Sequence, residues 1–241
     1  MMRGSFPRRA LRLGLVVALV ACGSGAPGGE DATETNGDDW VVDTRGVALS
    51  TAVSRQRVIS LIPSVTEIIV AMGGANQLAG RTRYDRDPQI AALPLVGGAL
   101  DANTEIILAL EPDLVIVEGT GGGQGLVHQL TSSGVPTFST HVRSIDAFRP
   151  QALLLGKLLG REREADSLAT WVDTQLEELR VDMAERDRAS VLFVVWPDPL
   201  LTTGAGTFVD DLTRLVGARS LFGDLNLPCT SLVFKIRGAT V

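Results

Sequence analysis

From Trp40 onward the chain alternates short apolar runs with longer amphipathic segments, and this alternation predicts a layered α/β fold. The clearest short run is Leu114-Val-Ile-Val117, which follows Pro112 and predicts a strand buried on both faces, as in a parallel sheet. Strands are expected at 58–62, 78–82, 114–118, 136–139 and 191–196. Helices are expected at 105–110, 124–133 and 207–216. A chain of 241 residues is long enough for one large α/β domain or for two lobes.

The segment 144–188 differs from the rest because it carries no strand signal. Its apolar residues recur at helical spacing, as at Leu154 and Leu158, and charged residues fill the other positions. We expect one helix broken near Gly160, or a long helix entered from a shorter one. Such a segment predicts a rigid connector between two α/β regions, but two crossover helices of a single sheet fit the spacing equally well.

The first 21 residues predict a secretory signal, because four arginines precede an apolar run at 13–21 that is too short to span a bilayer. The stretch Leu19-Val-Ala-Cys22 resembles the bacterial lipobox, so Cys22 is expected to carry a lipid. An ordinary signal peptide in which Cys22 is accidental is the alternative. Residues 22–39 are rich in glycine and acids and predict a flexible tether.

Net charge and cysteine content limit the possible partners and the possible disulfides of this chain. Loss of residues 1–21 would remove four arginines and no acids, which changes the formal net charge from −6 to −10. That balance argues against nucleic acid as a partner. The only other cysteine is Cys229, so lipidation of Cys22 would leave no intrachain disulfide.

Ser64-Val-Thr-Glu67 follows the first predicted strand and fits a capping box, in which Ser64 begins a helix and Glu67 bonds back to its amide. A second interpretation makes Ser64 the nucleophile of an exported α/β hydrolase. The motif is not Gly-x-Ser-x-Gly, however, and only His128 and His141 offer a base. The same shortage of histidine and cysteine argues against a zinc site.

A glycine-rich run at 118–125 lies between a predicted strand and a predicted helix, where α/β sheets often bind anions. It fits neither Gly-x-Gly-x-x-Gly nor a P-loop, because the third glycine and the Gly-Lys pair are missing. We therefore expect a flexible loop that lines a cleft.

Two predicted strand ends carry aromatic and charged side chains. Arg81, Arg83 and Tyr84 follow one strand and suit an oxygen-rich ligand through charge-assisted hydrogen bonds and stacking, although a plain polar turn is the simpler interpretation. Trp196 precedes Pro197 at the matching strand end of the later α/β unit. Together they suggest a cleft between two lobes.

These stretches resemble the substrate-binding lipoproteins of ABC importers for cobalamin, ferric siderophores and haem, most closely the cobalamin-binding branch. The most specific matches are Pro-Ser-x-Thr-Glu, ending at Glu67, and Ala-Leu-x-Pro-Asp-Leu-Val, which begins at Ala109. Further matching stretches lie at 82–88, 93–98 and 193–207.

The resemblance implies two Rossmann-like α/β lobes bridged by one long α-helix, with a ligand held between the lobes. The N-terminal lobe would span 40–143, the connector 144–188 and the C-terminal lobe 189–241. It also implies that Glu67 docks on the permease. Arg214 occupies the position expected for the second docking acid, so either an aspartate, Asp211, replaces it or docking is asymmetric. The family continues past Pro228, so we expect the C-terminal lobe to be truncated, and a fragment without a function of its own is a third interpretation.

The resulting hypothesis is a non-enzymatic, exported and lipid-anchored receptor without a cofactor or bound metal of its own. It would capture cobalamin or another metal chelate and deliver it to an ABC permease and its ATPase. Arg81, Arg83, Tyr84 and Trp196 are the predicted ligand contacts.

Overall fold

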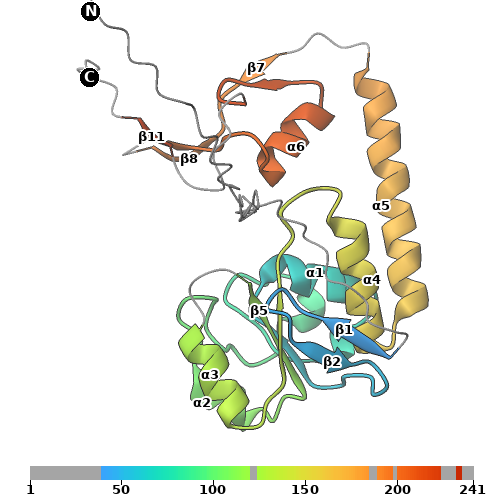
Figure 1. Ribbon diagram of the computed structural model, residues 1–241, viewed down its shortest axis with the longest axis vertical. Coiled ribbons are helices and arrows are strands. Elements are labelled where there is room, and N and C mark those ends of the chain that lie inside the picture. Colours follow the sequence, from blue (N-terminus) through green and yellow to red (C-terminus); the bar gives the residue numbers. More distant parts are fainter. Residues whose placement is uncertain (1–38, 120–123, 185–188, 198–199, 224–231, 235–241) are drawn as a thin grey trace, which may run out of the picture. The chain divides into compact units, whose positions relative to one another are not determined.

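The computed structural model describes residues 39–119, 124–184, 189–197, 200–223 and 232–234 (Figure 1). Its strands are β1 (Trp40–Val42), β2 (Ala48–Ser50), β3 (Val58–Ser60), β4 (Leu78–Gly80), β5 (Leu114–Glu118), β6 (Thr137–Thr140), β7 (Ser190–Val191), β8 (Val194–Pro197), β9 (Leu200–Thr202), β10 (Arg219–Ser220) and β11 (Leu232–Phe234). Its α-helices are α1 (Pro63–Ala71), α2 (Thr104–Ala109), α3 (Gln124–Ser132), α4 (Phe148–Leu159), α5 (Glu162–Met183) and α6 (Phe208–Leu215). Short 3₁₀ turns occur at Ala75–Gln77 and Pro88–Ile90.

The centre of the fold is a four-stranded parallel sheet in the order β4-β3-β5-β6. Alternate strand residues enter two apolar layers. Val58, Leu114 and Phe138 pack with α1 and α4, whereas Ile59 and Val115 pack with α2 and α3. Burial on both faces explains why β5, Leu-Val-Ile-Val followed by Glu118, is a nearly continuous apolar run. The predicted strands at 58–62, 78–82, 114–118 and 136–139 are confirmed within two residues at each end.

A hairpin formed by β1 and β2 precedes this sheet and was not predicted from the sequence. Its turn lies along the open edge of β6. Asp43 accepts a hydrogen bond from the Ser139 amide at 3.0 Å, and the Thr44 amide donates to the Ser139 carbonyl at 3.1 Å. Arg45 Nη2 donates to the Thr137 carbonyl at 2.9 Å. The turn therefore supplies the partners that a neighbouring strand would give an edge.

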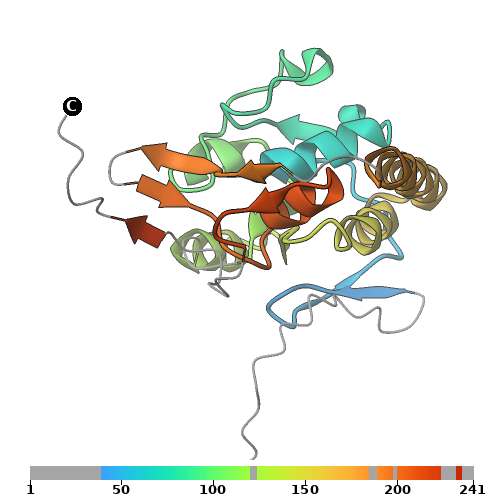
Figure 2. The same ribbon diagram turned by 90° about the horizontal axis from the view of Figure 1, so that it is seen from above.

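Helices α4 and α5 lie side by side (Figure 2). The chain turns between them at Gly160, whose φ of 64° lies in the left-handed region, so the predicted break near Gly160 is confirmed. Arg149 on α4 holds Asp166 and Asp173 on α5, at 3.0 Å and 2.6 Å. The strand that follows α5 pairs with β10 and not with the parallel sheet. The alternative of two crossover helices within one sheet is therefore wrong.

The residues after α5 form two small sheets. β7 and β10 pair in parallel, and β8, β9 and β11 form an antiparallel sheet in the order β11-β9-β8. The single strand predicted at 191–196 is therefore wrong, because two residues separate β7 from β8 and each strand belongs to a different sheet. The helix predicted at 207–216 is confirmed as α6, with the Thr207 side chain accepting a hydrogen bond from the Asp210 amide.

Candidate functional site

The carboxyl ends of four parallel strands lie along one edge of the main sheet, and in α/β folds such an edge is where ligands commonly bind. Helix α1 begins three residues after β3, and Arg81 follows β4 directly. Gly119 follows β5 and His141 follows β6. We call this line of strand ends the carboxyl edge.

A compact turn after β4 directs two of the predicted contact residues outward. The Thr82 amide donates to the Asp85 carboxylate at 2.5 Å, and the Tyr84 amide donates to the Thr82 hydroxyl at 3.2 Å. Thr82 and Asp85 are both buried. Between them, Arg83 and Tyr84 are exposed, and 59% of Tyr84 is accessible to solvent. The buried hydrogen bonds thus fix the backbone that presents the exposed pair.

The exposed pair has fixed neighbours. Arg83 forms an ion pair with Asp101, and its guanidinium carbon lies 6.0 Å from the centre of the Tyr84 ring. Gly98 lies beneath that ring, since a Cβ on Gly98 would be 3.2 Å from Tyr84 Cε2. We call Arg83, Tyr84 and Asp101 the rim. It offers a flat aromatic face, guanidinium donors and a carboxylate within one surface.

Arg81 was predicted to share this role, but its side chain is directed elsewhere. It is half-buried, and its Nε donates to the Ala91 carbonyl at 3.2 Å. A second, longer contact joins its Nη1 to the Thr82 carbonyl at 3.4 Å. Arg81 therefore supports the turn, and its contact with a ligand stays a prediction.

The ends of β5 and β6 meet the hairpin turn at Gly119. A Cβ on this residue would lie 2.6 Å from Thr44 Oγ1 and 2.9 Å from His141 Nδ1, so only glycine allows this approach. Thr44 Oγ1 also lies 3.0 Å from Ser139 Oγ. Small polar groups therefore line this part of the carboxyl edge. The loop predicted for the glycine-rich run falls mainly on 120–123, outside the described residues.

Glu67 lies on the exposed side of α1. The predicted capping box is wrong, because the N-cap is Ile62 and no side-chain hydrogen bond caps this helix. The physical reason is Pro63, which has no N–H to lose and a φ suited to the first helical position. Ser64 therefore lies inside the first turn, and the Glu67 carboxylate is not committed to a cap.

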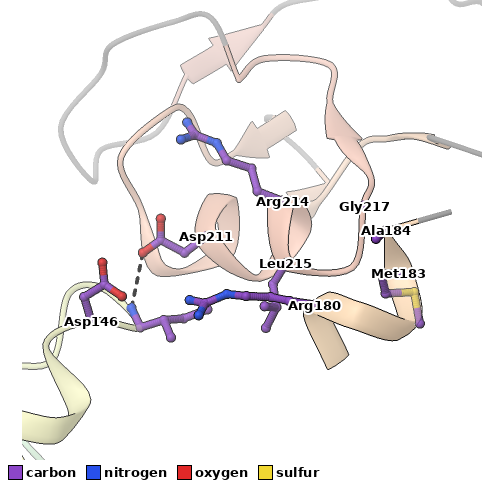
Figure 3. A pocket seen from close by; sticks show the side chains of 9 residues that line it. Asp146, Arg180, Met183, Ala184, Asp211, Arg214, Leu215 and Gly217 are labelled. Carbon is purple, nitrogen blue, oxygen red and sulfur yellow. Dashed lines mark hydrogen bonds between the residues drawn. The ribbon is translucent and has the colours of Figure 1, made fainter. Parts of the chain in front are cut away.

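Asp211 lies on α6 and lines a pocket of about 350 Å³ (Figure 3). Its carboxylate accepts a hydrogen bond from the Ile145 amide at 3.2 Å. Arg214, on the same helix, pairs with Asp210 at 2.5 Å, and the Asp210 side chain is only 3% exposed. Arg214 therefore neutralises a buried acid, which the sequence did not indicate.

The backbone of Trp196 belongs to the antiparallel sheet after α5 and not to the main sheet. Trp196 lies within β8, paired with Leu201, one residue before the strand ends, and its side chain is outside the described part of the chain. Cys22 and Cys229 also fall outside the described residues. The described residues contain no group of three or more His, Cys, Asp or Glu side chains placed to hold a metal ion. In the same ranges, no helix has both the length and the apolar character needed to cross a membrane.

The rim includes a residue that sequence reasoning missed. Asp101 is 18 positions from Arg83 and lies in an irregular segment, so no spacing rule connects them. In the sequence, Gly97 and Gly98 belong to the stretch 93–98, which resembles the family named above. Their doublet is the one local signal of a close backbone approach, because Gly97 has a φ of 97° and a Cβ there would lie 2.4 Å from the Asp101 carbonyl oxygen.

Known proteins are similar to this chain in sequence and fold. Residues 58–235 match the family described as periplasmic binding protein. An uncharacterized ABC transporter substrate-binding lipoprotein of Bacillus subtilis, YvrC, is 26% identical over 176 residues, and the vitamin B12-binding protein of Yersinia pestis is 29% identical over 178. These alignments cover 70% and 73% of this chain. The chain spans 56% and 64% of the length of those two relatives.

Among solved structures, the periplasmic heme-binding protein RhuT from Roseiflexus is 27% identical, with a TM-score of 0.65. The alignment covers 73% of this chain and 70% of RhuT. The vitamin B12-binding protein BtuF of Vibrio cholerae gives a TM-score of 0.64 at 24% identity, covering 74% of this chain and 70% of BtuF. The α/β fold predicted from the sequence is thus shared with these binding proteins.

Proposed function

The chain belongs to the periplasmic binding protein family, and on that premise we propose that it is the substrate-binding component of an ABC importer. It captures cobalamin or another metal chelate outside the cytoplasm and passes the ligand to a permease coupled to an ATPase. The observation that carries this proposal is the rim, where an exposed tyrosine and an arginine are held on a rigid turn at the carboxyl edge of a parallel sheet.

The side chains of the rim are chemically suited to a large ligand rich in oxygen atoms. A tyrosine ring gives apolar contact area with a polar end, and a guanidinium donates hydrogen bonds to amide or carboxylate oxygens. Corrinoids, haem and ferric siderophores all combine a flat or compact body with such oxygens. The names of the relatives point to vitamin B12 and heme, which favours these two chelates over other solutes.

Delivery to the permease is proposed to depend on Glu67. Its carboxylate is exposed on α1 and does not cap that helix, so it is available to a basic partner surface. The second docking acid predicted from the sequence, Asp211, stays a prediction, and its hydrogen bond to Ile145 argues against it.

Export and anchoring are also part of the proposal. Relatives of this family are periplasmic, and one is named a lipoprotein, which supports a secretory signal at 1–21 and a lipid on Cys22. Labelling of cells with radioactive palmitate tests the anchor. The expected result is labelled protein that a Cys22→Ser substitution leaves unlabelled, and equal labelling of both forms would exclude Cys22 as the lipid site.

The hydrolase interpretation has no support. The family comprises solute-binding proteins and not enzymes. Ser64 occupies the first turn of α1 as an exposed helix residue, and not the sharp strand-to-helix turn that exposes a nucleophile.

Equilibrium dialysis with cyanocobalamin, haemin and a ferric hydroxamate tests the proposed site. We expect Tyr84→Ala and Arg83→Gln each to weaken binding of the favoured ligand by about tenfold, through lost stacking and lost charged hydrogen bonds. Trp171→Ala is the matched control, because Trp171 is 61% exposed but lies on α5. Rim variants that bind as tightly as the parent would show that the ligand does not use the rim.

A further inference from the structure

The hydrogen bond between Asp211 and Ile145 joins segments that are far apart in sequence. Ile145 belongs to the segment between β6 and α4, and Asp211 lies in α6, 66 residues later. The bond is 3.2 Å long, and both residues are half-buried. In Figure 3 a dashed line from the labelled Asp211 carboxylate marks this hydrogen bond.

The segment before α4 is shaped to present this amide. The Phe148 amide donates to the Ile145 carbonyl at 3.0 Å, and the Ala147 amide donates to the Ser144 hydroxyl at 3.1 Å. These bonds form a tight turn at the start of α4, and its N-cap, Ala147, has no side-chain cap. Peptide N–H groups near a helix start favour a negative charge, and Asp211 supplies one.

The pocket beside this hydrogen bond makes the bond important for the distance between α6 and the segment before α4. The pocket has a volume of about 350 Å³ and is lined by Ile145, by Met183 and Ala184 at the end of α5, and by Leu215 on α6. Close apolar packing therefore does not fill this space, and a directional hydrogen bond carries more of the positioning.

The other charged residues that line the pocket have different roles from Asp211. Arg214 is paired with Asp210, and Arg180 makes a long contact of 3.4 Å with Glu177. Asp146 lines the same pocket but is exposed. Asp211 is thus the acid of this pocket that meets a backbone donor of the segment before α4.

We propose that Asp211 is a positioning residue that fixes the spacing between α6 and the segment 141–147 before any ligand binds. The relevance of that spacing to transport rests on the proposed function, because 141–147 continues from the carboxyl edge. The role also differs from the permease docking predicted for Asp211 from the sequence.

Nuclear magnetic resonance of the full chain, without ligand, tests the contact itself. We expect a through-hydrogen-bond coupling between the Ile145 amide nitrogen and the Asp211 carboxyl carbon, and slow hydrogen exchange at that amide. Asp211→Ala should accelerate the exchange by about tenfold or more, since the bond has a charged acceptor. Asp211→Asn keeps an acceptor oxygen and should restore most of the protection. Asp146→Ala is the matched control and should change nothing.

Spin labels test the spacing. The substitutions Ser133→Cys and Arg219→Cys, at two exposed positions, would carry the labels in a chain with Cys22→Ser and Cys229→Ser. Asp211→Ala should broaden the distance distribution between the labels, and Asp211→Asn should not. The through-hydrogen-bond coupling is measured in the parent chain, so it shows whether the Asp211–Ile145 bond forms even if Asp211→Ala does not fold.

Three results would overturn the proposal. The first is no coupling between Ile145 and Asp211, and the second is unchanged exchange in Asp211→Ala. The third is faster exchange with an unchanged distance distribution, because the bond would then form without setting the spacing. None of these measurements uses a ligand, so a failed binding experiment would reject the proposed function and leave this inference standing.

Discussion

Asp43 shows how one buried carboxylate organises the region before the family match. Its side chain is fully buried, and it accepts hydrogen bonds from the amides of Arg45, Val47 and Ser139 at 2.8, 2.9 and 3.0 Å. The Arg45 guanidinium completes the set at 2.5 Å and continues to Thr137. Asp43 therefore closes the turn and, together with Thr44 and Arg45, attaches it to the edge of β6.

We predict that Asp43→Ala destabilises the chain by about 3 kcal/mol, because buried donors and a cation lose their acceptor. Asp101→Ala is the control. It removes an acid that is 54% exposed and pairs with Arg83, so its cost should stay below about 1 kcal/mol. Urea unfolding gives both values. Equal losses in the two variants would mean that Asp43 is not the structural centre described above.

At the level of elements, the packing of α4 against α5 depends on Gly156. A Cβ at this position would lie 2.5 Å from Ala165 Cβ and 3.1 Å from the Arg161 carbonyl oxygen. Gly125, in α3, is the natural comparison, because a Cβ there would meet nothing within 4 Å.

Alanine at these two glycines should therefore have opposite effects. Gly125→Ala is expected to stabilise the chain by up to about 1 kcal/mol through helix propensity. Gly156→Ala gains the same propensity but must separate two helices, which costs roughly 1–3 kcal/mol, so a net loss is expected. Thermal unfolding of both variants checks the signs. Stabilisation by Gly156→Ala would show that α4 and α5 are not in close contact there.

The elements that the sequence predicted best are those whose local signals agree with their tertiary environment. Pro112 and the apolar run after it locate β5, and Gly160 locates the break between α4 and α5. The sequence failed for two reasons, a partner that is distant in sequence and a competing local rule. The β1–β2 hairpin is short and is stabilised by its hydrogen bonds to β6. The capping box expected at Ser64 does not form, because Pro63 occupies the first position of the helix.

The candidate site shows the same limit. Sequence position alone placed Arg83 and Tyr84 after a strand, and the structure shows that both are exposed there. Their neighbours Asp101 and Gly98 come from the following irregular segment, and no periodicity links them to the strand. Arg81 looked equivalent to Arg83 in sequence, but its side chain turns back to backbone carbonyls.

For the whole molecule, ligand capture and delivery should be separable by substitution. Glu67→Arg reverses the charge proposed to meet the permease but lies on α1 and not on the rim. We expect unchanged ligand affinity and uptake reduced at least about tenfold, because like charges would then meet in the docked complex. Uptake into proteoliposomes that contain the cognate permease and ATPase measures the effect.

Glu105→Arg is the matched control for docking, because Glu105 is also an exposed acid but lies on a different helix, α2. It should support normal uptake. A Glu67→Arg protein that transports as well as the parent would remove Glu67 from the delivery step, without affecting the proposal of ligand binding.

The most direct test of the central claim is calorimetric titration of the folded, full-length parent chain with cyanocobalamin, haemin and a ferric hydroxamate. The proposed function predicts saturable binding of one of these chelates, with one ligand per chain. Absence of saturable binding to all three, in protein shown by circular dichroism to be folded, would contradict a role as a receptor for metal chelates.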